Sequence, residues 1–121
     1  MDGRGREVRG RAGEAAAERE LTRRGLRLVE RDVRLAEGQI DLVMLDGDCL
    51  VLVEVKARRG AAFGLPAEAV DWRKRRKLRE LALAYRQLHP RLGRGLRIDV
   101  AAVRLGQGGA AESCEHLVNV G

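Results

Sequence analysis

Three charged side chains interrupt or directly follow two apolar segments in the middle of the chain, residues 40–45 (IDLVML) and 50–55 (LVLVEV). They are Asp41, Glu54 and Lys56. Burial of an unpaired charge is costly, so charges in such segments need an explanation. Two carboxylates and a lysine could hold Mg²⁺ and a water molecule for phosphodiester hydrolysis. The alternative is a buried salt-bridge cluster with no catalytic role.

The spacing of the two segments decides whether these side chains can meet. Asp46-Gly47 has the residue types of a tight type I′ turn, which predicts a β-hairpin. In that register Asp41 would lie opposite Leu52 and diagonal to Glu54, on the same face of the sheet as Glu54 and Lys56. A three-residue turn would put Asp41 on the other face. We therefore expect Asp41 and Glu54 to bind Mg²⁺ or Mn²⁺, and Lys56 to orient water or stabilise developing charge.

The surrounding periodicity predicts the elements that position these residues. We expect a basic, disordered arm over residues 1–11 and a single α/β domain over residues 12–121. Its predicted fold is a central mixed β-sheet flanked by helices, in α-β-β-β-α-β order. The expected helices cover 12–24 and a stretch from Pro66 or Asp71 to His89, and the expected strands cover 26–33, 40–45, 50–55 and 96–105, with 116–120 as a short edge strand.

A basic charge balance points to a polyanionic partner. The formal net charge is +6 at pH 7 and the pI is near 10.3, which favours encounter with nucleic acid. The alternative is an Arg-rich coding bias without a partner. The cations nearest the acidic residues are Arg58 and Arg59, and the segment 73–79 is densely basic. We expect phosphate contacts from Arg58, Arg59, Arg73, Lys74 and Lys77, although a charge run is also typical of a solvated helix face.

Other residues bear on the compartment. Cys49 and Cys114 form no disulfide framework, which suits a reducing cytoplasm, and no segment has the length and apolar character needed to span a membrane. We expect a cytoplasmic protein with no membrane partner. His89 and His116 lack metal-ligand spacing and are interpreted as structural. Asp99, in an apolar strand, is interpreted as a hydrogen-bonded structural residue, with a peripheral site role left open.

Three motifs in order along the chain carry a family resemblance: Gly13-Glu14, then 38–43 (GQIDLV), then 53–56 (VEVK). This set resembles the PD-(D/E)xK nuclease superfamily. More closely, the chain is similar to the uncharacterised YraN family, which resembles archaeal Holliday junction resolvases.

The resemblance implies a restriction-endonuclease-like core. It implies that Asp41 and Glu54 are metal-binding residues, that Lys56 is the catalytic lysine, and that Glu14 is a helix acid completing the centre. One position departs from the pattern, because Gln39 stands where the family commonly has Glu. An amide is a poorer Mg²⁺ ligand than a carboxylate, so Gln39 is a possible accessory residue only.

The leading hypothesis is a Mg²⁺-dependent endonuclease acting on structured or branched DNA in repair or recombination, with a homodimer possible because two strands must be cut. One rival is a nucleic-acid-binding protein that keeps the nuclease fold without turnover. Another is an interaction domain that docks an acidic protein on its basic helix.

Overall fold

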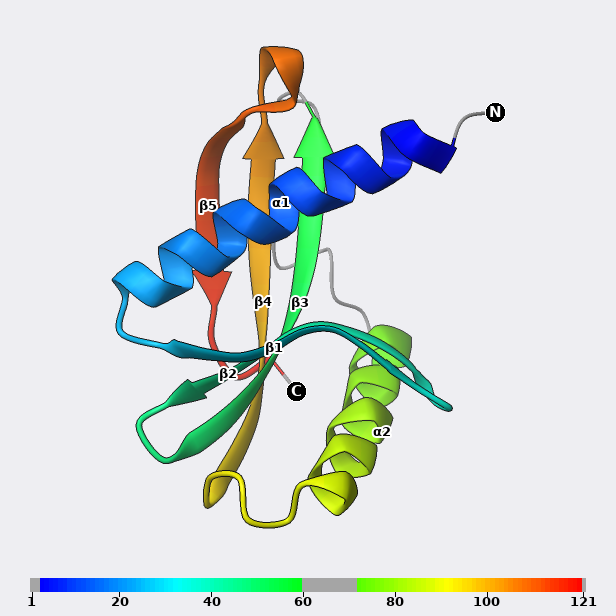
Figure 1. The fold of residues 1–121 in the computed structure, drawn as a ribbon, viewed down its shortest axis with the longest axis vertical. Coiled ribbons are helices and arrows are strands. Elements are labelled where there is room, and N and C mark those ends of the chain that lie inside the picture. The colour runs from blue at the N-terminus through cyan, green and yellow to red at the C-terminus, as the bar shows by residue number, and fades with distance from the viewer. Residues whose placement is uncertain (1–2, 60–71, 121) are drawn as a thin grey trace.

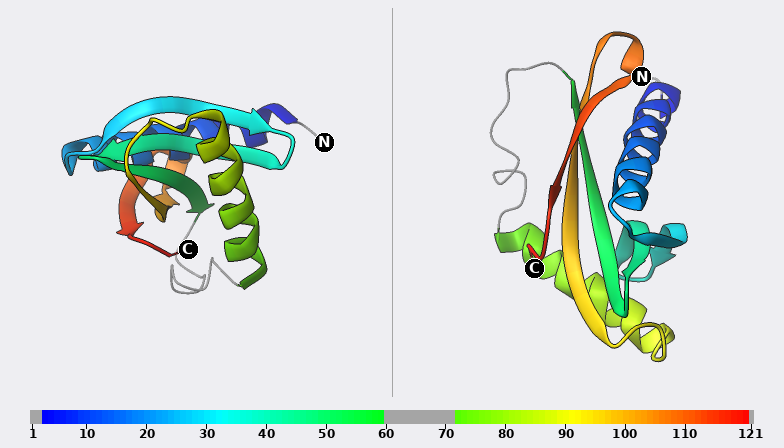
Figure 2. Two further views of the ribbon diagram at one scale, coloured as in Figure 1. Left: turned by 90° about the horizontal axis from the view of Figure 1, so that it is seen from below. Right: turned by 90° about the vertical axis from the view of Figure 1, so that its left-hand side faces the viewer.

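The computed structural model describes residues 3–59 and 72–120, and the side chains of residues 11–58 and 73–120. In these residues one sheet lies between two helices (Figures 1 and 2). The elements are α1 (Gly3–Arg23), β1 (Arg27–Leu35), β2 (Gly38–Asp46), β3 (Cys49–Arg59), α2 (Trp72–Leu88), β4 (Gly95–Leu105), the short 3₁₀ helix η2 (Gln107–Gly109) and β5 (Ala111–Leu117).

The sheet is mixed, as predicted, with strand order β1-β2-β3-β4-β5. Strands β1, β2 and β3 form an antiparallel meander, β3 and β4 are parallel, and β5 returns antiparallel to β4. The parallel pair requires a crossover connection, and α2 lies within it. The α/β class and the flanking helices therefore agree with the sequence, and β5 is a full edge strand that begins at Ala111, earlier than the predicted residue 116.

Helix α1 ends where the sequence predicted. Gly25 has a left-handed φ of 101°, and its N–H donates to the carbonyl of Thr22. The Leu26 N–H donates to the carbonyl of Leu21, which completes a Schellman motif with both leucines buried. The start of α1 differs from expectation, because the helix begins at Gly3, inside the segment expected to be a disordered arm.

The β2–β3 hairpin differs from its predicted register by two residues. Asp46 pairs with Cys49, so the turn is Gly47-Asp48 rather than Asp46-Gly47. Gly47 alone in this turn has a positive φ, 59°, which fits a type II′ turn and not the predicted type I′. Because side chains alternate with a period of two, a two-residue shift keeps the side chains of the paired residues, 42–46 and 49–53, on their predicted faces.

Two hydrophobic cores cover the two faces of the sheet. Ala16, Ala17 and Leu21 of α1 pack on one face, and Leu78, Leu81, Ala82 and Tyr85 of α2 pack on the other. Leu88, the last residue of α2, lies outside this core with an exposed fraction of 63%.

The predicted start of this helix at Pro66 or Asp71 lies outside the described residues. No helix within the described ranges is long and apolar enough to cross a membrane. Both cysteines are free, as expected.

Candidate functional site

The structure brings Asp41 and Glu54 together where β2 and β3 separate. Their ladder ends at the pair Leu42–Val53, and Asp41 and Glu54 are the next residues on the two strands. Beyond this point the backbone N–H of Val55 donates to Oδ2 of Asp41 at 2.8 Å. At the end of the ladder the side chain of Asp41, instead of a backbone carbonyl of β2, thus accepts a hydrogen bond from β3. In the corrected register Asp41 and Glu54 both follow the same ladder pair, whereas the predicted register put them on a diagonal.

A break in the alternation of β2 opens this position. Val43 faces the core beneath α2 and Leu42 faces the core beneath α1, as a regular strand requires. Ile40, however, lies in the same core as Val43, three residues away. The strand therefore twists about Asp41, and this lets the carboxylate sit between β2 and β3 instead of pairing through the backbone.

Asp41 is largely buried, and its surroundings disfavour the charged form of its carboxyl. Burial raises the pKa of its carboxyl from the ordinary 3.8 to about 6. This value is a net result, in which the hydrogen bond from Val55 and the charge of Lys74 lower the pKa and the charges of Glu54 and Asp32 add to the effect of burial. A carboxyl in this condition gains from a nearby cation, because a cation favours its charged form.

Glu54 faces α2. On β3, Leu50 and Leu52 lie in the core beneath α2, so Glu54 and Lys56 share that face by alternation. Lys74 of α2 confirms the placement, because its Nζ lies 3.4 Å from Oε1 of Glu54. Lys56 is half-buried and forms no ion pair within 4.0 Å with any described residue. A closed Asp–Lys–Glu salt-bridge cluster through Lys56, the structural alternative, is therefore not what the described residues form.

Glu14 reaches the same place from α1. A Cβ on Gly13 would lie 2.8 Å from Cβ of Ala57, so the absence of a side chain lets the helix pass close to β3. Burial, together with the charges of Asp41, Asp32 and Glu54, raises the pKa of Glu14 from 4.5 to about 7. The structure therefore gathers the acid that only the family resemblance had indicated.

Asp32 is an acidic neighbour that the sequence did not reveal. It has a left-handed φ of 52° in β1, and Oδ1 of Asp32 accepts a hydrogen bond from Nε2 of Gln39 at 2.8 Å. Aspartate tolerates this conformation better than most residues, but the pattern of β1 gave no sign of it. Gln39 is exposed, and its side-chain amide donates to Asp32, so the acid that it contacts is this neighbour.

The residues predicted to contact phosphate differ in their relation to the acidic residues. Lys74 is in direct contact with Glu54. Arg58 is exposed on β3, two residues beyond Lys56, and Arg73 and Lys77 are exposed on α2. The side chain of Arg59 lies outside the described residues.

The donor set limits the kind of metal that could bind. Among the described residues no group of three or more His, Cys, Asp or Glu side chains is placed to hold a metal ion. A protein cage of the zinc type is therefore not formed by them. Asp41 and Glu54 supply carboxylate oxygens, and one or two carboxylates with several waters are the usual protein environment of Mg²⁺. These residues fit a water-rich Mg²⁺ or Mn²⁺ ion.

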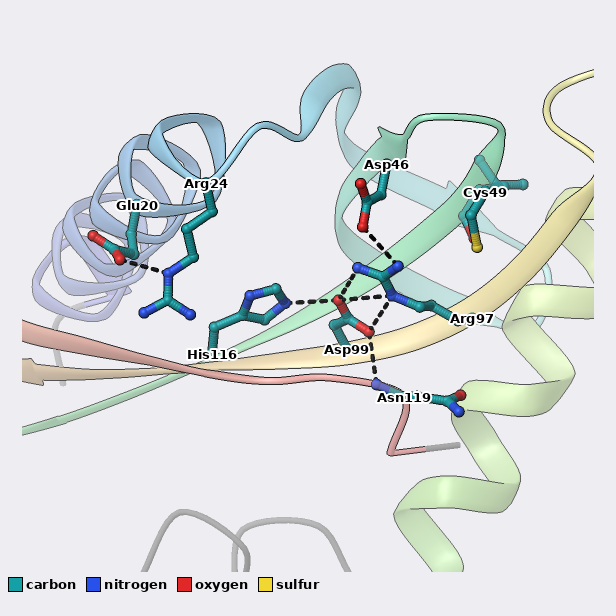
Figure 3. Close-up of polar contacts among 9 residues, drawn as sticks. Glu20, Arg24, Asp46, Cys49, Arg97, Asp99, His116 and Asn119 are labelled. Carbon is teal, nitrogen blue, oxygen red and sulfur yellow. Dashed lines mark hydrogen bonds and ion pairs between the residues drawn. The ribbon is translucent and has the colours of Figure 1, made fainter.

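A second polar cluster lies on the α1 face of the sheet, centred on the fully buried Asp99 (Figure 3). Nε and Nη2 of Arg97 donate to its carboxylate at 3.0–3.2 Å, and the N–H of Asn119 donates at 2.9 Å. Nε2 of His116 lies 2.7 Å from its Oδ2. Arg97 also donates to Asp46 at 2.8 Å. The structural interpretation of Asp99 and His116 is thereby confirmed, while His89 stacks on Tyr85 with ring centroids 4.3 Å apart.

Comparison with known proteins agrees with the sequence motifs. The model of the uncharacterised protein family UPF0102, which is the YraN family, matches residues 13–103. A UPF0102 protein of Beutenbergia cavernae is 46% identical over 118 residues, covering 98% of this chain and 99% of its own. A UPF0102 protein of Pelotomaculum thermopropionicum is 41% identical over 94% of this chain and 95% of its own. One from Ectopseudomonas mendocina is 48% identical over 78% and 80%.

Proposed function

Starting from the premise that the chain belongs to the uncharacterised protein family UPF0102, we propose that it is a Mg²⁺-dependent endonuclease with a restriction-endonuclease-like core. Its substrate is structured or branched DNA. The observation that carries this proposal is that Asp41 and Glu54 directly follow the last pair of the β2–β3 ladder, close enough for the charge of Glu54 to raise the pKa of Asp41, with Lys56 on the same face as Glu54. Membership of the nuclease superfamily rests on the sequence motifs and on this geometry.

Each residue has a role that its position supports. Asp41 and Glu54 would hold the ion. Burial raises the pKa of Asp41 to about 6, so a bound cation would stabilise its charged form. When bound, Mg²⁺ supplies a Lewis acid that activates water and neutralises charge on the phosphate. Lys56 orients the attacking water or stabilises the phosphorane-like charge. Hydrolysis adds one water across a P–O bond and leaves a phosphate monoester and a hydroxyl.

The basic residues supply affinity without reading sequence. Arg58 extends the row of Glu54 and Lys56 along β3, and Arg73 and Lys77 add exposed charge on α2. Such contacts bind phosphates regardless of base identity and weaken as salt increases. Recognition of DNA shape, rather than of a base sequence, fits this surface.

The test is cleavage of linear duplex, single-stranded, flapped and four-way-junction DNA with Mg²⁺ or Mn²⁺. We expect metal-dependent cutting that Asp41→Ala abolishes and that Lys56→Ala reduces by about 10²–10³-fold. Two matched controls lie at the far end of the same sheet, where Asp48 and Arg94 form an exposed pair. Asp48→Ala and Arg94→Ala remove a carboxylate and a cation there and should leave the rate unchanged.

Two results would reject the nuclease proposal. One is the absence of cutting on every substrate with either metal. The other is cutting that survives in Asp41→Ala and Lys56→Ala, since that activity would come from a contaminant. DNA binding that persists without cutting would favour the non-catalytic binding protein.

A further inference from the structure

Lys74 links α2 directly to the paired carboxylates. Its Nζ lies 3.4 Å from Oε1 of Glu54, and the two side chains are 34% and 12% exposed. Its charge also lowers the pKa of Asp41. Lys77, the other described lysine of α2, has a different partner. Its Nζ lies 3.9 Å from Oε2 of Glu80 on the same helix.

The position of this ion pair is unusual for a purely structural one. Glu54 is mostly buried beside Asp41, and two adjacent carboxylates repel each other without a counter-ion. A lysine is a compact charge on a long flexible stem, so its ammonium can move several ångströms while α2 stays in place. About a third of the Lys74 side chain is exposed, so a phosphate of a bound strand can approach this lysine from the solvent.

We propose that Lys74 is an exchangeable counter-ion that couples metal binding to nucleic-acid binding. In the metal-free protein it neutralises Glu54. When Glu54 takes part in metal binding, Lys74 leaves it and contacts a phosphate of the bound strand. Lys74 is thus a positioning residue for the substrate, and its role rests on the metal site of the proposed function.

This exchange makes two predictions that a static ion pair does not make together. First, Glu54 competes for Lys74 and for the metal, so loss of the lysine strengthens metal binding. Second, the ammonium reaches the phosphate once Glu54 has released it, so the metal increases DNA affinity through Lys74. By thermodynamic linkage, the gain in DNA affinity with metal equals the gain in metal affinity with DNA.

The experiment measures both quantities in three variants. Lys74→Met removes the ammonium, Lys74→Arg keeps a cation, and Lys77→Met removes a neighbouring α2 cation that is not bonded to Glu54. Mn²⁺ binding to the protein alone is measured by electron paramagnetic resonance. The affinity for a labelled four-way junction is measured by fluorescence anisotropy in EDTA and in Ca²⁺, at constant ionic strength. Thermal unfolding checks that each variant is folded.

We expect Lys74→Met to bind Mn²⁺ about twofold to fivefold more tightly than the natural protein, the size expected of a partly exposed ion pair. Ca²⁺ should increase the DNA affinity of the natural protein by about fivefold or more, and Lys74→Met should lose most of this gain. Lys74→Arg should restore the gain. Lys77→Met should weaken DNA binding by the same factor in EDTA and in Ca²⁺.

The inference is overturned if Lys74→Met keeps the full gain in Ca²⁺, or if it binds Mn²⁺ no more tightly than Lys77→Met does. Failure of the proposed function gives a different pattern. If the natural protein binds no Mn²⁺, the metal site itself is rejected and the inference falls with it. If Mn²⁺ binds with the predicted coupling but no DNA is cut, the counter-ion role stands and the catalytic proposal fails.

Discussion

Two aspartates interrupt apolar strands of the same sheet, and their surroundings differ in one decisive respect. Asp99 is fully buried, and both of its oxygens are bonded by Arg97, His116 and the backbone of Asn119. Asp41 is largely buried as well, but among the described residues it accepts one hydrogen bond, from Val55. One carboxylate is neutralised by the protein, and the other is left with capacity for a further partner.

The difference shows how a structural acid can be told from a site acid. A buried charge is tolerated when it is paired and hydrogen-bonded, as Asp99 is. Where the partners are too few, the pKa rises, as it does for Asp41, and the fold gives up stability for that residue. The acids gathered around Asp41 increase this cost, because burial and, to a smaller extent, the charges of its acidic neighbours raise the pKa of Glu14 to about 7.

The largest effect should come from breaking the satisfied cluster. Asp99→Asn removes the charge that pairs with Arg97, and replaces the carboxylate oxygen 2.7 Å from Nε2 of the nearly buried His116 by an amide atom. We expect the free energy of unfolding to fall by about 3–5 kcal/mol. Urea unfolding monitored by circular dichroism measures it. A loss below about 1 kcal/mol would mean that this network does not hold β4 and β5 together.

Removal of the charge of Asp41 should instead increase the free energy of unfolding at high pH. The pKa of Asp41 is raised in the folded state, so the folded protein holds a proton that the unfolded chain releases between about pH 4 and pH 6. Stability therefore falls as the pH rises through this window, and the loss is complete above it. Asp41→Asn removes the charge, and its amide oxygen can still accept from Val55.

In EDTA at pH 8, Asp41→Asn should raise the free energy of unfolding by roughly 2 kcal/mol. This gain should disappear below about pH 4. Urea unfolding across the pH range gives the curve, with Asp48→Asn, an exposed aspartate in the turn, as the control. A destabilised Asp41→Asn at pH 8 would show that Asp41 is a structural acid like Asp99.

The smallest effect should come from Glu14. Burial raises its pKa to about 7, but its side chain is only partly buried and solvent screens its charge. Glu14→Gln should stabilise the metal-free protein at pH 8 by less than Asp41→Asn does. The pH at which its gain appears should be higher, between about 5 and 7. Thermal unfolding in EDTA at pH 5 and pH 8 measures it, and an equal melting temperature shift at both would contradict the raised pKa.

Sequence patterns predicted the side-chain faces better than they predicted the register. The apolar alternation of β3 put Glu54 and Lys56 on one face, and a shift of two residues at the turn preserved that result, whereas the break in the alternation of β2 lets the carboxylate of Asp41 lie between the two strands. The prediction of the turn residues was wrong, because Asp46-Gly47 and Gly47-Asp48 both have residue types that suit a two-residue turn. Propensity alone cannot choose between two such neighbours when both keep the apolar faces buried.

The rest of the candidate site depends on tertiary contacts that no local pattern encodes. Asp32 owes its relevance to a left-handed backbone in a strand, and Lys74 owes its own to the path of α2 across β3. The sequence showed Lys74 as one cation in a basic run. Only the packing of the helix distinguishes it from Lys77.

The mixed sheet also implies an order in which the molecule assembles. Strands β2 and β3 are joined by a two-residue turn, so Asp41 and Glu54 can meet in a local hairpin at little entropic cost. The parallel β3–β4 pair must wait for the whole crossover to close, and slow pairing of distant segments is the usual consequence. A β2–β3 hairpin that formed before β4 pairs with it would hold the two acids close together with only solvent and counter-ions to screen their charges.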